Sequence, residues 1–168
     1  MNEYIEALKS KNPRVCTTCK ILKKERMKHC KHCDCCVPVF DHHCDNLATC
    51  IGRDNAKFFL MFQMVDFACA IFFMRNCWLY PIVHRKLQAG LMTIVSTQIA
   101  INVMSFQSLY LACKGWTLNE RENWRRYKWM HKIENRNGKQ YRIFSAKYDK
   151  GCVKNLYNLC CAHREKIE

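Results

Sequence analysis

Cysteine and histidine residues recur at a fixed spacing in the N-terminal third of the chain. The pattern C-x2-C-x9-H-x6-C occurs twice, and each position of the second copy follows its counterpart in the first by 14 residues. A C-x2-C turn supplies two thiolates, and a more distant His and Cys complete the four ligands that zinc binds tetrahedrally in structural sites. The spacing predicts two Cys3His zinc sites, with Cys16, Cys19, His29 and Cys36 in the first and Cys30, Cys33, His43 and Cys50 in the second.

The two sites are expected to take the place of a hydrophobic core. Residues 1–57 are polar, basic and rich in Cys and His, with few apolar positions at helical spacing. Metal binding therefore has to supply the folding free energy, on the order of 10 kcal/mol for each site. His29 of the first site is followed directly by Cys30 of the second, so the two sites must lie side by side.

A possible nucleophile remains beside these ligands. In the stretch FDHHCDNLATC, assigning His43 to zinc leaves Asp41, His42 and Cys44. A thiol, an imidazole base and a carboxylate that fixes the tautomer of the base are the parts of an activated nucleophile. The neighbouring zinc ligands would hold this loop rigidly. The alternative is that Cys44 is a spare thiol or a substitute metal ligand.

Two apolar segments follow the Cys-rich region. The first runs over residues 58–83, and no charged residue occurs from Leu87 to Cys113. A helix as long as the second segment rises roughly 40 Å, enough to cross a hydrocarbon core of about 30 Å with tilt. Basic residues flank both outer ends, as in a membrane hairpin whose flanks are cytosolic. The alternative is a pair of buried core helices, because Gln63, Asp66 and Arg75 are expensive in lipid.

Composition sets the wider frame. The net charge of +14 fits either a nucleic-acid partner or the cytosolic side of a membrane. No cleavable signal peptide is expected, because the first residues lack an apolar stretch, and reduced metal-binding cysteines are favoured over disulfides. The predicted fold class is an α-helical integral membrane protein with a two-helix hairpin and a small, loop-rich, zinc-stabilised domain. The predicted parts are the Cys-rich domain at 1–57, transmembrane helices at 58–83 and 91–113, a short lumenal loop at 84–90 and a basic cytosolic tail at 114–168.

The stretch from Cys16 to Phe59 resembles the DHHC family of protein S-acyltransferases. It reads C-x2-C-x9-HC-x2-C-x2-C-x4-DHHC-x5-C-x4-N-x3-F. Further on, WTLNE resembles the TTxE element of the family, and GCVKNLYN resembles the C-terminal segment of the branch that carries ankyrin repeats. The residues that match single positions of these family motifs are Asn55, Phe59, Thr117, Glu120 and Asn155.

The resemblance implies a membrane-bound, multi-pass protein S-palmitoyltransferase that works in two steps. Cys44 would take a long-chain acyl group from palmitoyl-CoA, with His42 as general base and Asp41 orienting it. Cysteines of cytosolic-facing proteins would then receive the acyl group. Two Zn2+ ions would be structural, and the acyl chain would lie in a cavity between membrane helices. The active site and both termini would face the cytosol, and the protein would reside in the Golgi or the endoplasmic reticulum. It would contact the lipid bilayer and would not bind nucleic acid.

Three departures from the family pattern leave alternatives. Asp45-Asn46 replaces Pro-Trp after the DHHC row, and Leu118 stands where the second Thr of TTxE is expected. Family members also have at least four membrane spans, so this chain is expected to be a fragment or a divergent member that lacks the first pair. The negative charge of Asp45 should oppose thiolate formation at Cys44. A catalytically inactive, zinc-stabilised membrane adaptor is therefore the alternative function, whereas the hydrophobic hairpin argues against a basic zinc finger that binds nucleic acid.

Overall fold

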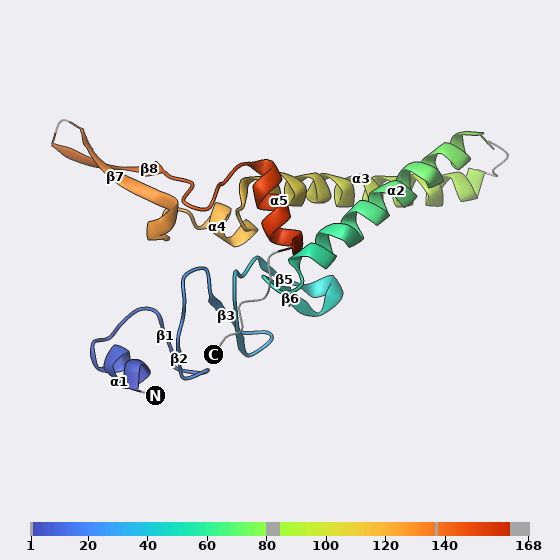
Figure 1. Ribbon diagram of the computed structural model, residues 1–168. Helices are drawn as coiled ribbons and strands as arrows, with labels where there is room; N and C mark the ends of the chain where they lie inside the picture. Colours follow the sequence, from blue (N-terminus) through green and yellow to red (C-terminus); the bar gives the residue numbers. More distant parts are fainter. Residues whose placement is uncertain (1, 80–84, 137, 162–168) are drawn as a thin grey trace.

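The computed structural model describes residues 2–79, 85–136 and 138–161 (Figure 1). The Cys-rich domain lies at one side of a central junction. From this junction two long helices extend in one direction and a β-hairpin extends in the opposite direction (Figure 1). The short helices α4 (Leu118–Glu122) and α5 (Cys152–Cys161) lie at the junction itself, where they meet the Cys-rich domain and the long helices.

The Cys-rich domain consists of a short helix and three two-stranded antiparallel hairpins. The hairpins are offset by 14 residues, since the pairs Cys16↔Ile21, Cys30↔Cys35 and Cys44↔Thr49 hold equivalent places. The turn of each hairpin contains a non-glycine residue with positive φ, and these three are also 14 residues apart: Lys20, Asp34 and Ala48. The elements are α1 (Asn2–Lys9), β1 (Val15–Cys16), β2 (Ile21–Leu22), β3 (Lys28–Cys30), β4 (Cys35–Val37), β5 (His42–Cys44), the 3-10 helix η1 (Asp45–Leu47) and β6 (Thr49–Ile51).

The apolar core of this domain is very small. Its buried members are Cys30, Phe40 and Cys50, with Cys33 and Val37 packed against them. Three of these five residues are predicted zinc ligands, so little apolar surface remains to hold the hairpins together. This agrees with the expectation that metal binding supplies the folding free energy of the domain.

Helix α2 (Ala56–Leu79) begins directly after the third hairpin. The side chain of Asn55 accepts a hydrogen bond from the backbone N–H of Gly52 (2.9 Å) and donates one to the carbonyl of Cys50 (2.9 Å). These bonds fix the start of α2 to a predicted zinc ligand. The predicted helix at 58–83 is present from its start to Leu79. Residues 80–83 lie outside the described residues.

Helix α3 (Arg85–Lys114) begins earlier than predicted. Residues 85–90, predicted as part of a lumenal loop, are helical because Arg, Lys, Leu, Gln and Ala all favour a helix. The helix ends at Gly115, whose φ of +68° lies in the left-handed region that glycine adopts most easily. A Cβ atom at Gly115 would lie 2.7 Å from the carbonyl oxygen of Tyr148, so a larger residue would also push the C-terminal segment away.

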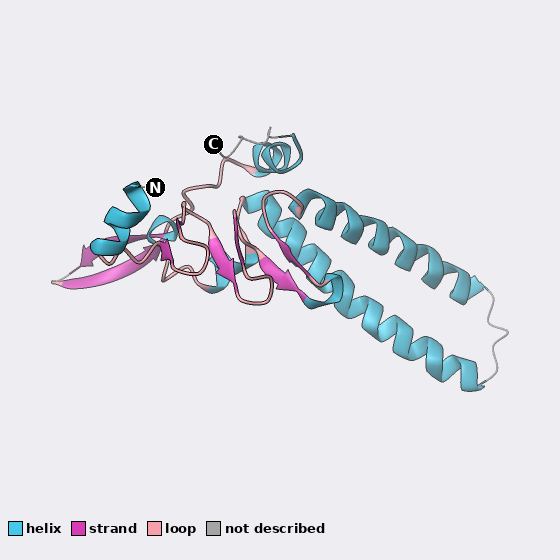
Figure 2. Cartoon of the chain, turned by 90° about the horizontal axis from the view of Figure 1, so that it is seen from below, coloured by secondary structure: helices cyan, strands magenta, loops and turns pink. Residues whose placement is uncertain are grey.

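The two long helices lie side by side (Figure 2) and are joined by polar and aromatic contacts. Gln98 donates a hydrogen bond to the Asp66 carboxylate (2.6 Å), and the rings of Phe67 and Phe106 meet edge to face. Within the described residues, α2 is the helix that is long and apolar enough to cross a membrane, and only 11 % of its most apolar stretch is buried in the chain. By the same measure α3 does not qualify, so the membrane hairpin remains a prediction.

The C-terminal third of the chain, predicted as a basic tail, folds into several elements. Its strands β7 and β8 form an antiparallel hairpin that makes a two-stranded sheet of its own. The segment after β8 returns to the junction, where the last helix packs on α3. The elements are α4 (Leu118–Glu122), the 3-10 helix η2 (Lys128–Met130), β7 (His131–Arg136), β8 (Lys139–Phe144) and α5 (Cys152–Cys161).

Candidate active site and metal sites

The structure gathers the eight predicted zinc ligands into two groups of four. Within each group the possible ligand atoms all lie within 4.8 Å of one another, so each group could hold a metal ion. Nδ1 of His29 lies 3.3 and 3.9 Å from the sulfurs of Cys19 and Cys36. Nδ1 of His43 lies 3.4 to 3.7 Å from the three sulfurs of its own group. Neighbouring ligands of a tetrahedral zinc are about 3.6 Å apart, so the donor sets fit this metal.

The electrostatics of the two groups also favour a cation. Burial, together with the neighbouring sulfurs of Cys16 and Cys19, raises the pKa of the Cys36 thiol to about 12. Burial likewise raises the pKa of Cys50, which lies against the sulfurs of Cys30 and Cys33. Closely packed thiolates repel one another, so three of them can be deprotonated together only beside a positive charge.

An aspartate lies near the outer nitrogen of each histidine ligand. Nε2 of His29 is 3.7 Å from a carboxylate oxygen of Asp34, and Nε2 of His43 is 3.6 Å from one of Asp45. The Asp45 side chain is 91 % exposed and turned toward His43, so water screens its charge. We therefore expect its opposition to a Cys44 thiolate to be small.

The third hairpin shows why Cys44 is left over. Cys44 occupies the place in β5 that the predicted zinc ligands Cys16 and Cys30 occupy in the first two hairpins. The second cysteine of the C-x2-C turn is missing from this copy, because Leu47 stands in its place. Among the described residues, Cys44 belongs to neither of the two groups that could hold a metal ion. The sequence contains two copies of the metal-ligand pattern, whereas the backbone contains three copies of the hairpin.

His42 and Cys44 lie on the same face of β5. Side chains alternate along a strand, and His43 between them faces the metal group. Nδ1 of His42 is 2.6 Å from Oδ2 of Asp41, and Phe59 meets the His42 ring edge on. The structure thus brings Asp41 and His42 together, while no hydrogen bond joins His42 to Cys44 among the described residues.

The other carboxylate oxygen of Asp41 ties the site to the segment that resembles TTxE. Oδ1 of Asp41 accepts a hydrogen bond from the backbone N–H of Leu118 at 2.6 Å. Because the backbone makes this contact, the absence of the second Thr side chain does not remove it. Thr117 and Glu120 hold the backbone in place through a reciprocal capping box at the start of α4.

An ion pair between the buried Glu120 and the partly buried Arg26 anchors this segment to the Cys-rich domain. Arg26 donates from Nε and Nη2 to the two carboxylate oxygens of Glu120, at 2.7 and 2.6 Å. Glu120 also accepts a hydrogen bond from the indole N–H of Trp129 (3.0 Å). Sequence reasoning found Glu120 but missed Arg26, which is 94 residues away in the chain. Because the chain contains many lysines and arginines, nothing in the sequence distinguished Arg26 from the other basic residues.

Asn155 holds the last helix against the end of α3. Its side chain donates hydrogen bonds to the carbonyl of Cys113 (2.8 Å) and to Asp149 (2.9 Å), and it accepts one from the N–H of Lys150. The N–H of Gly151 and the Asn155 amide hold the pKa of Asp149 below its ordinary value. Asn155 thus joins α5 to the end of α3 beside the segment that carries Thr117 and Glu120.

A cavity of about 420 Å3 lies where α2, α3 and α5 meet the third hairpin. Its lining includes Asp41 and His42 but not Cys44. The cavity therefore reaches the Asp41–His42 pair, and side chains of α2 and α3 form part of its wall. Other lining residues are the apolar Phe59, Leu60, Met104 and Leu111 and the basic Arg53 and Lys57.

Comparison with known proteins agrees with this arrangement. The profile of the DHHC palmitoyltransferase family matches residues 9–125, which is more than half of the chain. That range includes both metal groups, the row Asp41–Cys44, the two long helices and α4. The chain belongs to the DHHC palmitoyltransferase family.

Individual relatives cover different shares of the chain. It is 42 % identical to palmitoyltransferase ERF2 of Candida glabrata over 77 residues, which is 45 % of this chain and 23 % of that protein. It is 30 % identical to palmitoyltransferase ZDHHC17 of Mus musculus over 175 residues, 87 % of this chain and 26 % of that protein. It is 27 % identical to palmitoyltransferase swf1 of Schizosaccharomyces pombe over 133 residues, 67 % of this chain and 37 % of that protein. The chain thus spans between 23 and 37 % of the length of these curated relatives.

Proposed function

We propose that the chain carries the catalytic region of a protein-cysteine S-palmitoyltransferase with Cys44 as nucleophile. The observation that carries this proposal is the 2.6 Å contact between Asp41 and His42, on a strand whose next same-face residue is Cys44. This pair lines a cavity whose wall also carries apolar side chains, including Phe59, Leu60 and Leu111, which suits an acyl chain. The names of the relatives point to the same chemistry.

The proposed reaction has two transfers. The Cys44 sulfur attacks the thioester carbon of a long-chain acyl-CoA, and the bond between that carbon and the coenzyme A sulfur breaks. Nε2 of His42 takes the proton of the Cys44 thiol and returns it to the departing sulfur, while Asp41 keeps Nδ1 protonated. A cysteine thiol of a substrate protein then attacks the acyl-Cys44 thioester. His42 takes the proton of that thiol and passes it to the sulfur of Cys44.

The proposal includes two structural zinc ions. The eight clustered Cys and His residues would hold them, and the ions would supply folding free energy rather than chemistry. Because His43 of β5 and Cys50 of β6 belong to the same group of ligands, metal binding would keep the two strands of the third hairpin in place. Zinc would thus act on Cys44 through the position of its strand.

We propose that α2 and α3 form a membrane hairpin with both flanks cytosolic and its tip on the lumenal side. The exposed surfaces of both helices carry large apolar side chains, including Phe62, Phe72 and Val103. The polar residue Asp66 bonds to Gln98 on the other helix, which lowers the cost of placing a carboxylate in lipid. The basic flanks agree with the cytosolic side.

The partners follow from this orientation. Cys44 would lie near the cytosolic membrane surface, where an acyl chain in lipid and a head group in water can both be reached. The basic lining residue Lys57 suits a phosphate of coenzyme A, whereas Arg53 is paired with Asp54 at 3.3 Å. The acyl acceptors would be cysteines of cytosolic-facing proteins at the Golgi or endoplasmic reticulum.

Acyl transfer to a cysteine peptide tests the function directly. Purified protein in detergent is given labelled palmitoyl-CoA and a peptide with one cysteine, and hydroxylamine-sensitive label on the peptide is measured. Cys44→Ser should abolish transfer, whereas Cys35→Ser, on the adjacent hairpin and outside both metal groups, should retain it. Absence of transfer from protein that carries two zinc ions would instead support the inactive adaptor, which Asp45-Asn46 favours.

A further inference from the structure

In the described part of the chain, the β7–β8 hairpin packs on other elements only near its base, where Phe144 meets Trp116 and Trp124. Its strands pair only with each other, and both outer edges are open. Ile133 is 59 % exposed and Tyr141 is 49 % exposed, although both are apolar or aromatic. An isolated hairpin is marginally stable in water, and an open strand edge is a template for another extended chain. These features suit a surface that binds a partner strand.

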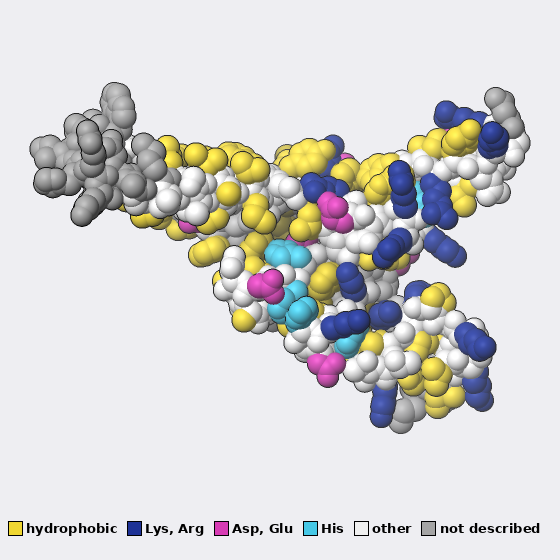
Figure 3. Space-filling view, turned by 180° about the vertical axis from the view of Figure 1, so that it is seen from behind, with side chains coloured by type: hydrophobic (Ala, Val, Ile, Leu, Met, Phe, Trp, Pro, Cys, Tyr) yellow, Lys and Arg dark blue, Asp and Glu magenta, His cyan; other side chains and the backbone are white. Residues whose placement is uncertain are grey.

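The hairpin is strongly basic. It carries four cations, Lys132, Arg136, Lys139 and Arg142, against the single carboxylate of Glu134. Arg136 and Lys139 lie directly opposite each other in the register, an arrangement of like charges that destabilises a bare hairpin. Dark blue side chains are prominent along this arm in Figure 3. The Glu134 carboxylate accepts a hydrogen bond from Arg136 at 2.9 Å and offsets part of this repulsion, and carboxylates of a partner would offset the rest.

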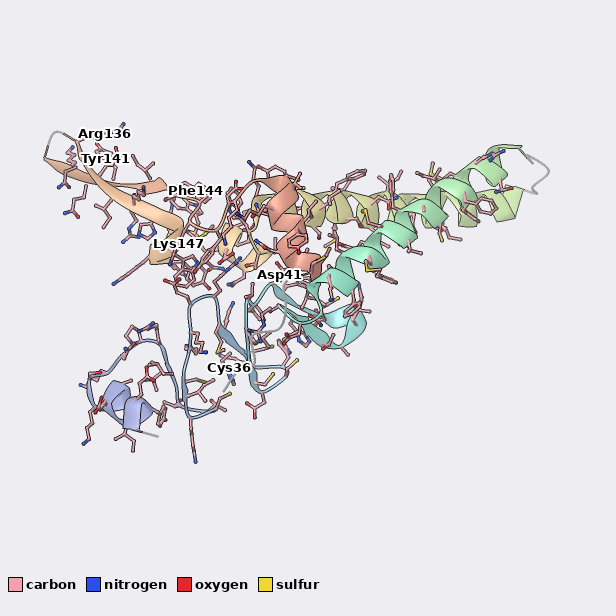
Figure 4. All side chains as sticks on the ribbon, viewed as in Figure 1. Cys36, Asp41, Arg136, Tyr141, Phe144 and Lys147 are labelled. Atoms are coloured by element: carbon pink, nitrogen blue, oxygen red, sulfur yellow. The ribbon has the colours of Figure 1, made fainter. Side chains whose placement is uncertain are left out.

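The base of the hairpin is fixed to the active-site segment. Phe144 meets the rings of Trp116 and Trp124 edge to face, with centroids 4.7 and 5.9 Å away. Trp116 directly precedes Thr117, which caps the helix whose first N–H holds Asp41. Figure 4 shows Phe144 at the base of the hairpin and Arg136 and Tyr141 toward its tip. A partner bound to this arm would therefore be placed at a set distance from the proposed nucleophile.

The direction of the hairpin favours a protein partner over lipid. Figures 1 and 2 both show it extending away from α2 and α3, on the opposite side of the junction. Strands of six residues reach roughly 20 Å. If the two helices cross a bilayer, the basic tip lies beyond the head groups rather than among them.

We propose that the β7–β8 hairpin is a docking arm for an acidic, extended segment of the substrate protein. The segment would add to an open edge as a further strand, with carboxylates near Arg136 and Lys139 and an apolar side chain against Tyr141. The identity of the partner as a substrate rests on the proposed acyltransferase function. Binding itself does not depend on that function.

Fluorescence anisotropy with a labelled ten-residue peptide of alternating Glu and Val tests the arm. Purified full chain in detergent should bind this peptide saturably and more weakly at high salt, and should not bind a Lys-Val peptide. The double variant Arg136→Glu/Lys139→Glu should lose at least tenfold in affinity, and Tyr141→Ser should also weaken binding. The control Lys9→Glu/Lys11→Glu makes the same charge change on and beside α1, away from the hairpin, and should bind as wild type does (Figure 1).

Several results would overturn this inference. The inference fails if the wild type does not bind the peptide, or if the hairpin variant and the α1 control variant lose peptide affinity equally. It also fails if the hairpin binds phosphatidylserine vesicles and not the peptide. Equal unfolding midpoints for wild type and the hairpin variants exclude misfolding as the cause of any loss. Acylation of Cys44 separates the two proposals. If only the docking arm is wrong, acylation persists without peptide binding, and if only the acyltransferase function is wrong, binding persists without acylation.

Discussion

Replacing Glu120 by alanine should weaken the junction between the Cys-rich domain and the helices. The Glu120 side chain is 2 % exposed and accepts hydrogen bonds from Arg26, from the indole of Trp129 and from the N–H of Thr117. Its removal leaves the Arg26 guanidinium, which is only 16 % exposed, without a counter-charge. It also removes half of the capping box that positions the N–H of Leu118 on Asp41.

The expected loss is large because the pair is buried. Breaking a buried ion pair by removing one partner destabilises proteins by about 3–5 kcal/mol. Glu122, two residues later on the same helix, provides a matched control, since its side chain is 59 % exposed and pairs with the exposed Arg121. An exposed pair contributes roughly 0–1 kcal/mol. The two substitutions should thus differ by several-fold in their effect on the free energy of unfolding.

Denaturant unfolding of the purified protein, followed by tryptophan fluorescence, measures both variants. Trp129 bonds to Glu120 and so reports on the junction itself. Cys44 acylation should fall in Glu120→Ala and stay near wild type in Glu122→Ala. Equal unfolding midpoints for the two variants would refute the role assigned to the Arg26–Glu120 pair.

Four further outcomes are expected. His42→Ala should slow Cys44 acylation about 100-fold or more without releasing zinc, as measured by initial rates and elemental analysis. Cys36→Ser should reduce the zinc content from two ions to one or fewer, while its neighbour Cys35→Ser should retain two. Without metal, the pKa of the Cys36 thiol is about 12, so this thiol must lose its proton to bind zinc. Zinc release to a chelator should therefore become faster as the pH falls. A release rate that does not change with pH would contradict this. Replacing Asp45-Asn46 by Pro-Trp should raise the acylation rate less than about tenfold, and a slower rate would contradict the expected sign.

The metal groups could be predicted because their signal is local and repeated. Each group takes its ligands from a short stretch, and the second copy repeats the spacing of the first. Hairpins of equal length then place equal positions together, as the pairs His29↔Cys36 and His43↔Cys50 show. The adjacency of Asp41 and His42 likewise carried over from the sequence into a 2.6 Å contact.

The contacts that support the site could not be predicted in the same way. Arg26 and Glu120 are 94 residues apart, and nothing in either local pattern indicates the other. The third hairpin escaped notice because Leu47 interrupts the ligand pattern while the backbone repeat continues. The β7–β8 hairpin did leave a signal, since Asn137-Gly138 between two strand-like runs is a typical hairpin sequence. The many charged residues in that segment led instead to its prediction as a basic tail.

Mass spectrometry of the peptide that contains Cys44 tests the central claim most directly. The purified protein is incubated with palmitoyl-CoA in the absence of any acceptor, quenched in acid and digested. The proposed mechanism predicts that the Cys44 peptide gains one palmitoyl group that hydroxylamine removes, while the peptides that carry the metal ligands stay unmodified. An unmodified Cys44 in protein that holds two zinc ions, or label that persists in Cys44→Ser, would contradict the account.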